Sequence, residues 1–381
     1  MMQGLQIRIP QRLALLRAIT VLSFLLCISV TFPLWYTVHL FPAASVFEID
    51  QRSSELPLYL TLVILLCFSA SFIFRWHRLL LILGLLALSA LLLLDLNRLQ
   101  QWVFIYGSML LVLASYNGRV DEPSRFTSYF IMLQIIVCSL YFFTGFYQLQ
   151  DGFIENGLAP ALAPVRGLFS PRQFGFILTA GKILPFVTMF TAIALFVAPL
   201  RYLGITFAIL LHLALILLGY PLRTGDVAGY IMNISMIPLV LVLFSGKTKE
   251  RYFSPVFLLQ RPLFYLVCAV FLVMPFFNVT SKWPDELSAN VYSGNKEKIT
   301  IKLPVSTYLR LPLFVKNFCK PHQQKILLDH QAWCRYELSV SCTNSKPVMK
   351  AIITQLEFWN RGPVKDLELH TSIKKPLLVK P

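Results

Sequence analysis

The chain has 381 residues, of which 56% are hydrophobic and 14% charged, and its 34 Lys+Arg against 18 Asp+Glu give a net charge of +16. Soluble globular domains are about 45–50% apolar and about 25% charged, so this composition excludes a soluble enzyme and a disordered chain. Several apolar runs approach the ~20 residues that cross a bilayer, and we therefore expect a multi-pass membrane protein.

Nine apolar segments follow one another along the chain. The first could be a signal peptide, because Arg8, Arg12 and Arg17 precede it, but its apolar run is longer than the about 7–15 residues of a signal-peptide core. We therefore expect an uncleaved first span in an all-α bundle of about nine transmembrane helices. The predicted spans are 18–40, 57–74, 79–95, 102–116, 126–147, 183–200, 204–220, 229–245 and 261–278.

Lysine and arginine in the short loops predict the orientation, because cytoplasmic loops carry more of both residues. With the N-terminus in the cytoplasm, more of these cations fall inside than outside. The inside set is Arg8, Arg12, Arg17, Arg75, Arg78, Arg119, Arg125, Arg201, Lys247, Lys249, Arg251 and Arg261, and the outside set is Arg52, Arg98, Arg166, Arg172, Lys182 and Arg223. Nine spans then place the C-terminus outside a plasma or inner membrane, whereas an even number would place it inside.

The apolar pattern ends near Asn278, which predicts a transmembrane domain over residues 1–281 and a soluble extracytoplasmic domain over residues 282–381. We expect this small domain to be rich in β-strands. Alternation with period two predicts strands at 298–302, 337–341 and 351–358, and a helical stretch is expected around 321–335. The basic surface of the domain suits anionic headgroups or an acidic peptide, although a solvated surface without a partner is the commoner arrangement.

The connection between the fifth and sixth spans, residues 148–182, is too broken by Gly and Pro to span and too apolar to be fully solvated. It is either an amphipathic loop that faces lipid or a lid over a cavity. Among the seven cysteines, Cys319, Cys334 and Cys342 lie in the predicted outer domain, where a disulfide would persist, and the sequence does not choose the pair. The histidines and cysteines lack zinc-like spacing, and no metal is expected.

Polar and ionisable residues gather at the predicted outer ends of the spans or within them, where they are costly and usually face a cavity or a partner. These residues are Asp95, Asn97, Arg98, Asp151, Glu155, Lys182, His212, Arg223, Asp226 and Asn233. They predict an outward-facing polar cavity. The alternatives are structural: ion pairs at span ends, packing for the histidine and interhelical bridging for the asparagine. Lys182 is the sole lysine before residue 247, and it is either a base with a lowered pKa or a side chain that extends to the interface.

The segment from Asp95 to Gly107, Asp-Leu-Asn-Arg-Leu-Gln-Gln-Trp-Val-Phe-Ile-Tyr-Gly, resembles the opening of a span in the HTTM superfamily, which contains vitamin K-dependent gamma-carboxylase. Residues 141–157, His212 and Asn233 resemble later landmarks of that family, and the likeness covers roughly residues 10–280. The resemblance implies a nine-helix bundle with an extracytoplasmic C-terminal domain.

This chain departs from the carboxylase at positions that matter for chemistry. Gln148 stands where the carboxylase has a lysine, thought to act as its base, and Trp102 stands where it has a histidine. A glutamine does not take up a proton at physiological pH. The resemblance therefore implies the fold and a cavity that includes Trp102 and Gln148, without implying carboxylation of glutamate.

Three functions remain open from the sequence. The first is binding or processing of a lipid-soluble ligand or an exported peptide in the cavity, a peptide maturation or secretion role. The second is a quinol-coupled enzyme that uses reduced quinone, with Lys182 as a substitute base. The third is a non-catalytic assembly partner that binds another membrane protein. The partners expected are the lipid bilayer and such a peptide or protein, and not nucleic acid.

Overall fold

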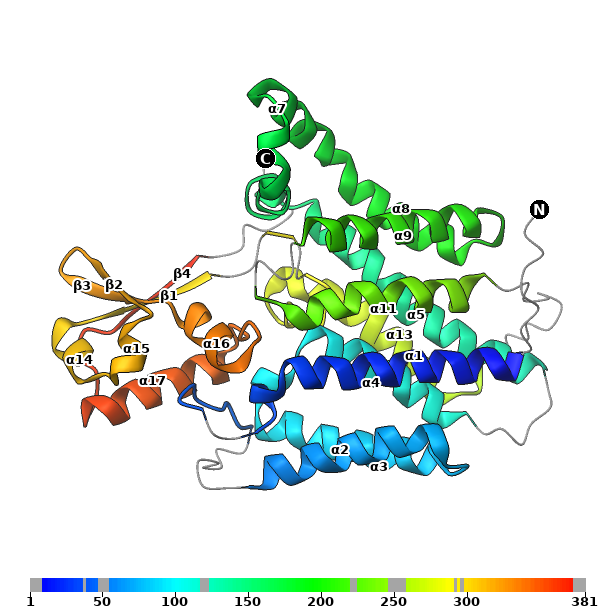
Figure 1. The fold of residues 1–381 in the computed structure, drawn as a ribbon, viewed down its shortest axis with the longest axis horizontal. Helices are drawn as coiled ribbons and strands as arrows, with labels where there is room; N and C mark the ends of the chain where they lie inside the picture. The colour runs from blue at the N-terminus through cyan, green and yellow to red at the C-terminus, as the bar shows by residue number, and fades with distance from the viewer. Residues whose placement is uncertain are drawn as a thin grey trace.

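The computed structural model describes residues 9–36, 39–46, 55–116, 123–219, 225–245, 258–290, 293–294 and 298–372. Figure 1 shows a bundle of roughly parallel and antiparallel helices with a smaller domain at one end. Within the described residues, eight helical segments are long and apolar enough to cross a membrane. They comprise α1 (Ile9–Val30), α2 (Leu56–Ile73), α3 (His77–Leu94), α5 (Pro123–Gln148), α7 (Pro171–Ala180) with η5 (Gly181–Ile183) and α8 (Leu184–Phe196), η6 (Ala198–Leu200) with α9 (Arg201–Leu218), α11 (Val227–Phe244), and α13 (Pro262–Cys268) with η8 (Ala269–Val273) and η9 (Met274–Thr280).

A ninth apolar helix, α4 (Gln101–Ser115), corresponds to the shortest predicted span. Its 15 residues extend about 22 Å at 1.5 Å per residue, less than the ~30 Å hydrocarbon core. It is buried on most sides, and Trp102, Tyr106 and Met109 are among its buried residues. The outer helices have many exposed Leu, Ile and Phe side chains, as expected for surfaces that face lipid.

The first predicted span is present, but its bounds of 18–40 are wrong, because α1 begins earlier, contains Arg12 and ends at Val30. Burial of this arginine is possible because its guanidinium donates to the carbonyl of Val242 from Nε at 3.2 Å and Nη2 at 2.7 Å, and to the carbonyl of Leu243 at 3.3 Å. These carbonyls end α11, where the unpaired C=O groups carry partial negative charge.

Two other arginines bind helix ends in the same way. Arg78 donates to the carbonyl of Ala114 near the end of α4 at 3.0 Å, and Arg201 donates to the carbonyl of Leu195 near the end of α8 at 3.3 Å. Like Arg12, both belong to the predicted inside set, and the helix ends that they bind lie far from the C-terminal domain (Figure 1). A guanidinium group can bind more than one carbonyl at once, as Arg12 does with Val242 and Leu243.

The connection over residues 148–182 forms a series of short helices. Gly152, with φ 92°, turns the chain after α5. Three short helices then precede α7, namely η3 (Phe153–Leu158), α6 (Ala159–Leu162) and η4 (Ala163–Leu168). Gly181 packs closely against Leu158, so the segment folds back on itself before α8.

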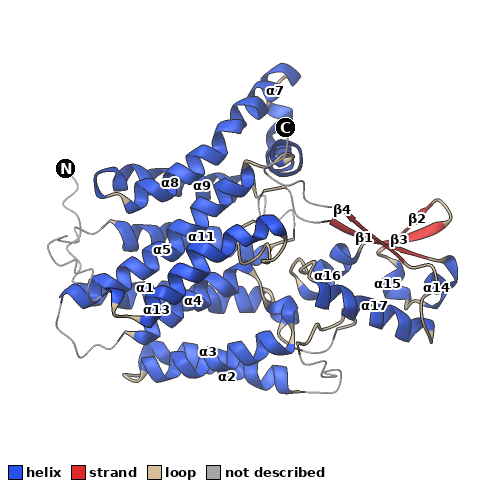
Figure 2. Ribbon diagram, turned by 180° about the vertical axis from the view of Figure 1, so that it is seen from behind, coloured by secondary structure: helices blue, strands red, loops and turns tan. Residues whose placement is uncertain are grey.

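The C-terminal domain contains an antiparallel sheet in the order β2-β3-β1-β4, drawn in red in Figure 2. Its strands are β1 (Lys298–Leu303), β2 (Cys319–His322), β3 (Lys325–Leu328) and β4 (Glu368–Ser372). Its helices are α14 (Val305–Arg310), α15 (Leu313–Lys316), α16 (His330–Leu338) and α17 (Lys346–Asn360). Buried residues of β1, β3, α16 and α17, including Ile301, Leu328, Trp333 and Ile352, form its core.

The strand predicted at 298–302 is confirmed, and the other two are wrong. Residues 351–358 belong to α17, where Val348, Ile352 and Leu356 share one buried face at a spacing of four. The segment 337–341 contains the last two residues of α16 and the turn after it. Ser339 is the C-cap of the helix and has a left-handed backbone conformation, with φ 58°. The helix expected at 321–335 is also partly wrong, because β2 and β3 precede α16. Over five to eight residues, apolar and polar side chains alternate as in a strand. Over the 15 residues of α17, the buried side chains instead recur every four residues, as in a helix.

Candidate functional site

The connection between α3 and α4 brings together several predicted site residues. Asp95 is fully buried, and its Oδ1 accepts hydrogen bonds from the Ala44 amide at 3.0 Å, the Asn97 amide at 3.0 Å and the Asn97 Nδ2 at 2.9 Å. Asn97 also donates from Nδ2 to the Pro42 carbonyl at 3.2 Å. The carboxylate therefore fastens residues 42–44 to the end of α3.

Arg98 is buried beside this carboxylate, with 1% of its surface exposed. It donates from Nε to the Leu34 carbonyl at 3.1 Å and from Nη1 to the Leu91 carbonyl at 3.1 Å. Burial lowers the pKa of the guanidinium, and the Asp95 charge opposes that shift. Asp95 and Arg98 thus lie together as expected, and the Arg98 amide donates to the Asp95 carbonyl at 3.1 Å, but the side-chain hydrogen bonds of each residue go to other groups.

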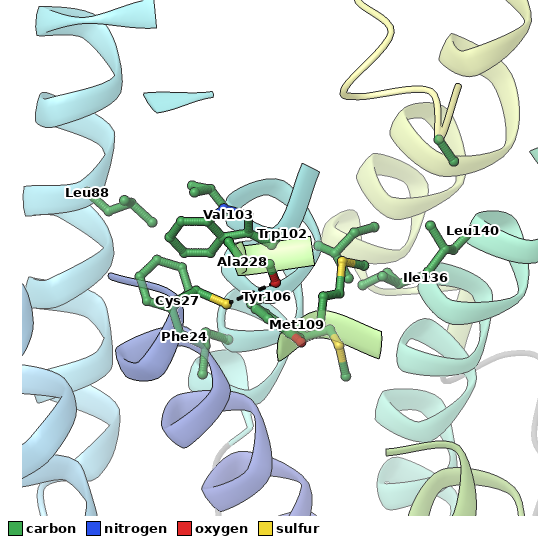
Figure 3. Close-up of a cluster of buried hydrophobic side chains, with 14 of the residues drawn as sticks. Phe24, Cys27, Leu88, Trp102, Val103, Tyr106, Met109, Ile136, Leu140 and Ala228 are labelled. Carbon is green, nitrogen blue, oxygen red and sulfur yellow. Dashed lines mark hydrogen bonds between the residues drawn. The ribbon is translucent and has the colours of Figure 1, made fainter. Parts of the chain in front are cut away.

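Trp102 lies in the first turn of α4, four residues after Arg98, and we call Asp95, Asn97, Arg98 and Trp102 together the α3–α4 cluster. Its indole packs on Phe24 with 5.3 Å between ring centroids and on Trp35, which follows the Leu34 carbonyl that Arg98 binds, at 5.9 Å. Figure 3 shows Trp102 beside Phe24 and Cys27, whose thiol donates to the Ala228 carbonyl of α11. Trp102 therefore sets one side of the cluster against the core, where α1 meets α4 and α11.

Three polar atoms of the α3–α4 cluster are buried without a hydrogen-bond partner. They are the second carboxylate oxygen of Asp95 (Oδ2), the amide oxygen of Asn97 (Oδ1) and the indole nitrogen of Trp102 (Nε1). A buried polar atom that loses water without gaining a partner costs roughly 1–3 kcal/mol. Such atoms therefore indicate a place where a water or a ligand group supplies the missing bond.

The C-terminal domain covers this region through contacts that the sequence did not reveal. The Glu337 carboxylate on α16 accepts from the backbone amides of Leu40, at 3.2 Å, and Phe41, and from Trp333 Nε1 at 3.0 Å. Phe41 packs on Trp333 with 4.9 Å between ring centroids.

A second contact lies closer to the cluster. Gln100 donates from Nε2 to the Asn97 carbonyl at 2.7 Å and to the Ser341 carbonyl at 3.2 Å, so one side chain joins the cluster to the C-terminal domain. Glu337 and Gln100 lacked a sequence signal because the contacts by which they join the C-terminal domain to the bundle are with backbone groups far away in the chain.

His212 and Asn233 form a second polar group inside the bundle. Asn233 donates from Nδ2 to the Gly229 carbonyl at 2.8 Å, so its Oδ1 faces His212 Nδ1 at 2.8 Å and accepts the ring proton. His212 Nε2 then accepts from the Tyr141 hydroxyl at 2.7 Å. Both ring nitrogens are occupied, which is the arrangement of a neutral histidine that joins α5, α9 and α11. Asp226 begins α11 and accepts from the Gly229 amide at 2.8 Å.

The remaining predicted residues are separate from these groups. Gln148 ends α5 with its Oε1 buried and unpartnered, whereas Asp151 and Glu155 are exposed on the connection that follows. Lys182 is exposed on η5. Arg223 lies outside the described residues, and so does its predicted pairing with Asp226.

A small cleft lies between α4, α5, η8 and residues 286–289. Its interior volume of about 10 Å³ admits about one water. Phe104, Ser139, Phe143 and Phe271 are among its lining residues, and none of the predicted site residues lines it.

The part of the chain that the structure describes contains no group of three His, Cys, Asp or Glu side chains that could hold a metal ion. In comparisons with known proteins, no family model, no curated protein and no solved structure matches the chain.

Proposed function

We propose that the chain is an integral protein of a plasma or inner membrane that binds an exported peptide, or a lipid-soluble ligand carrying an amide-like group, at the α3–α4 cluster. The N-terminus lies in the cytoplasm, and the C-terminal domain lies outside, above the cluster. The role is that of an HTTM-like protein in the maturation or secretion of a peptide.

The observation that carries this proposal is the set of unpartnered atoms in the cluster. Asp95 Oδ2 and Asn97 Oδ1 are acceptors and Trp102 Nε1 is a donor. A peptide group has an N–H and a C=O, so it can satisfy both kinds of atom, whereas a hydrocarbon chain satisfies neither. Gln148 Oε1 is a further unpartnered acceptor, at the end of α5, and it would accept a hydrogen bond from a more distant part of the ligand.

The distribution of arginines supports the orientation. Arg12, Arg78 and Arg201 bind helix ends at the end of the bundle remote from the C-terminal domain. An excess of arginine at one end is typical of the cytoplasmic side. The cluster, at the opposite end, would then face the exterior, where an exported peptide arrives.

The geometry favours binding over quinol-coupled carboxylation. A base has to lie within hydrogen-bond reach of the proton that it takes. Gln148 is not a base, and Lys182 is exposed on a separate element, η5. His212 has both nitrogens engaged with Tyr141 and Asn233.

Native mass spectrometry of the full chain, isolated from its membrane in mild detergent, tests the proposal. We expect a bound peptide or amide-containing lipid on the wild-type chain and its loss in Asp95→Asn. The asparagine oxygen can still accept the three hydrogen bonds of Oδ1, while its Nδ2 replaces the unpartnered acceptor by a donor. Trp102→Phe removes the unpartnered N–H, keeps the aromatic packing and leaves the charges near Arg98 unchanged, and we expect it to release the ligand as well.

Asp366→Asn is the matched control, because Asp366 is exposed in the C-terminal domain and its φ of 62° is one that asparagine tolerates. This variant should keep the ligand. A wild-type chain without any bound species, or a species that both Asp95→Asn and Trp102→Phe retain, would show that the cluster holds water alone.

A further inference from the structure

Two of the three cysteines in the C-terminal domain are brought to the same end of α16. Cys334 is on α16, and Ser339, with φ 58°, reverses the chain so that Cys342 returns beside it. The Cys334 thiol lies 3.4 Å from the carbonyl of Val340, two residues before Cys342, and Gln331, one turn earlier on α16, donates from Nε2 to the Cys342 carbonyl at 3.1 Å. Both side chains are buried, with 0% and 4% of their surface exposed.

The third cysteine is placed elsewhere. Cys319 begins β2, where it stands opposite Leu328 of β3. Its thiol lies 3.7 Å from the Val315 carbonyl of α15. Three cysteines allow three pairings, and the geometry favours one of them.

We propose that Cys334 and Cys342 form a disulfide in the mature protein and that Cys319 remains a free thiol. The inference rests on the outside location of the C-terminal domain in the proposed function, since disulfides persist in oxidising compartments. The bond forms by exchange with the disulfide of a thiol–disulfide oxidoreductase. One cysteine thiolate attacks that disulfide and releases a thiolate, and the second cysteine then displaces the oxidoreductase. Two protein thiols are thereby oxidised and one oxidoreductase disulfide is reduced to a dithiol.

Burial determines when this reaction takes place. The pKa of the Cys334 thiol is raised by burial and by the neighbouring Cys342, and a protonated thiol is a poor nucleophile. Thiol–disulfide exchange at Cys334 therefore takes place before α16 packs into the domain. Once formed, the disulfide is shielded from soluble reductants.

The position of the bond connects it to the α3–α4 cluster. Residues 335–341 form the loop that the disulfide would close, and this loop contains both Glu337 and Ser341. Glu337 holds the Leu40 and Phe41 amides, and the Ser341 carbonyl accepts from Gln100. The disulfide would thus fix the two groups that hold the C-terminal domain over the cluster.

Peptide mass spectrometry tests the pairing in the full chain. The membrane protein is denatured with an alkylating reagent present and without reductant, and is then cut with trypsin. Arg335 separates the two cysteines, so the disulfide would link peptide 326–335 to peptide 336–350, while peptide 317–325 would carry alkylated Cys319. We expect the linked pair to disappear on reduction and in Cys342→Ala, and to persist in Cys319→Ser.

A reporter fused after Pro381 distinguishes the two ways to fail. If the reporter is active outside and all three cysteines are alkylated, or if Cys319 is linked to either partner, the pairing is overturned while the proposed function stands. If the pair is linked but both Asp95→Asn and Trp102→Phe retain the ligand, the proposed function fails and the disulfide stands. A cytoplasmic reporter with free thiols overturns both.

Discussion

Glu337 allows the docking of the C-terminal domain to be tested with a nearly isosteric change. Its two carboxylate oxygens accept from three donors, the Leu40 amide, the Phe41 amide and the indole of Trp333. In Glu337→Gln one oxygen becomes an NH₂ group, which donates and cannot accept. At least one N–H then faces another donor, whichever way the amide is turned.

The expected loss follows from these contacts. A hydrogen bond to a charged group contributes about 1.5–3 kcal/mol and a neutral one about 0.5–1.5 kcal/mol. Loss of one bond and weakening of the others should therefore destabilise the docked arrangement by about 2–4 kcal/mol. Since 1.4 kcal/mol corresponds to a factor of ten, exchange of the Leu40 and Phe41 amides should accelerate roughly 30- to 1000-fold.

Hydrogen–deuterium exchange of the full chain in detergent measures this directly on peptides covering residues 39–46. Glu368→Gln is the matched control: Glu368 lies on β4 opposite Lys302 and forms an exposed ion pair with Lys325 at 2.6 Å, worth at most about 1 kcal/mol. Unchanged protection of Leu40 and Phe41 in Glu337→Gln, or the same acceleration in both variants, would refute the docking geometry.

Four further predictions concern other parts of the molecule. Arg12→Lys should lower the stability of the bundle by about 1–3 kcal/mol in thermal unfolding, because one ammonium cannot reproduce the guanidinium contacts with the end of α11; unchanged unfolding would argue against this helix-end role. Burial lowers the pKa of His330 below its ordinary 6.5, so the unfolded chain binds more protons. Stability of the C-terminal domain should therefore be complete above about pH 6.5 and fall as the pH drops below it, and His330→Gln should flatten that slope. With Gln148 at the position of the expected base, a peptide containing glutamate should gain no carbon dioxide when supplied with reduced quinone, as mass spectrometry would show. A reporter after Pro381 should be active outside the cytoplasm and one near Lys247 inside, and activity on the same side would make the predicted span count wrong by one.

The helical bundle could be predicted from the sequence because long apolar runs in a chain of this composition have few alternatives. The boundaries were less predictable. The start of α1 was placed too late because Arg12 counted against a span, although its charge is satisfied on carbonyls of α11. The Val242 carbonyl that binds Arg12 is 230 residues away in the chain, so no local sequence pattern predicts the contact.

The candidate site shows the same limit. Asp95, Asn97 and Arg98 are close in sequence, so their grouping could be predicted, and the contact of His212 with Asn233 agrees with their selection as polar residues inside spans. Glu337 and Gln100 were missed because they bind backbone groups of distant segments. In the C-terminal domain, windows of five to eight residues could not distinguish the alternation of a strand from part of a helical face, and α17 was therefore misassigned.

The most direct test of the central claim is an experimental density map of the full chain at high resolution, prepared without delipidation. The account predicts continuous density, longer than a water molecule, within hydrogen-bond distance of Asp95 Oδ2, Asn97 Oδ1 and Trp102 Nε1. Isolated water peaks at these three atoms, or side chains that turn to satisfy one another, would contradict a ligand site at the α3–α4 cluster.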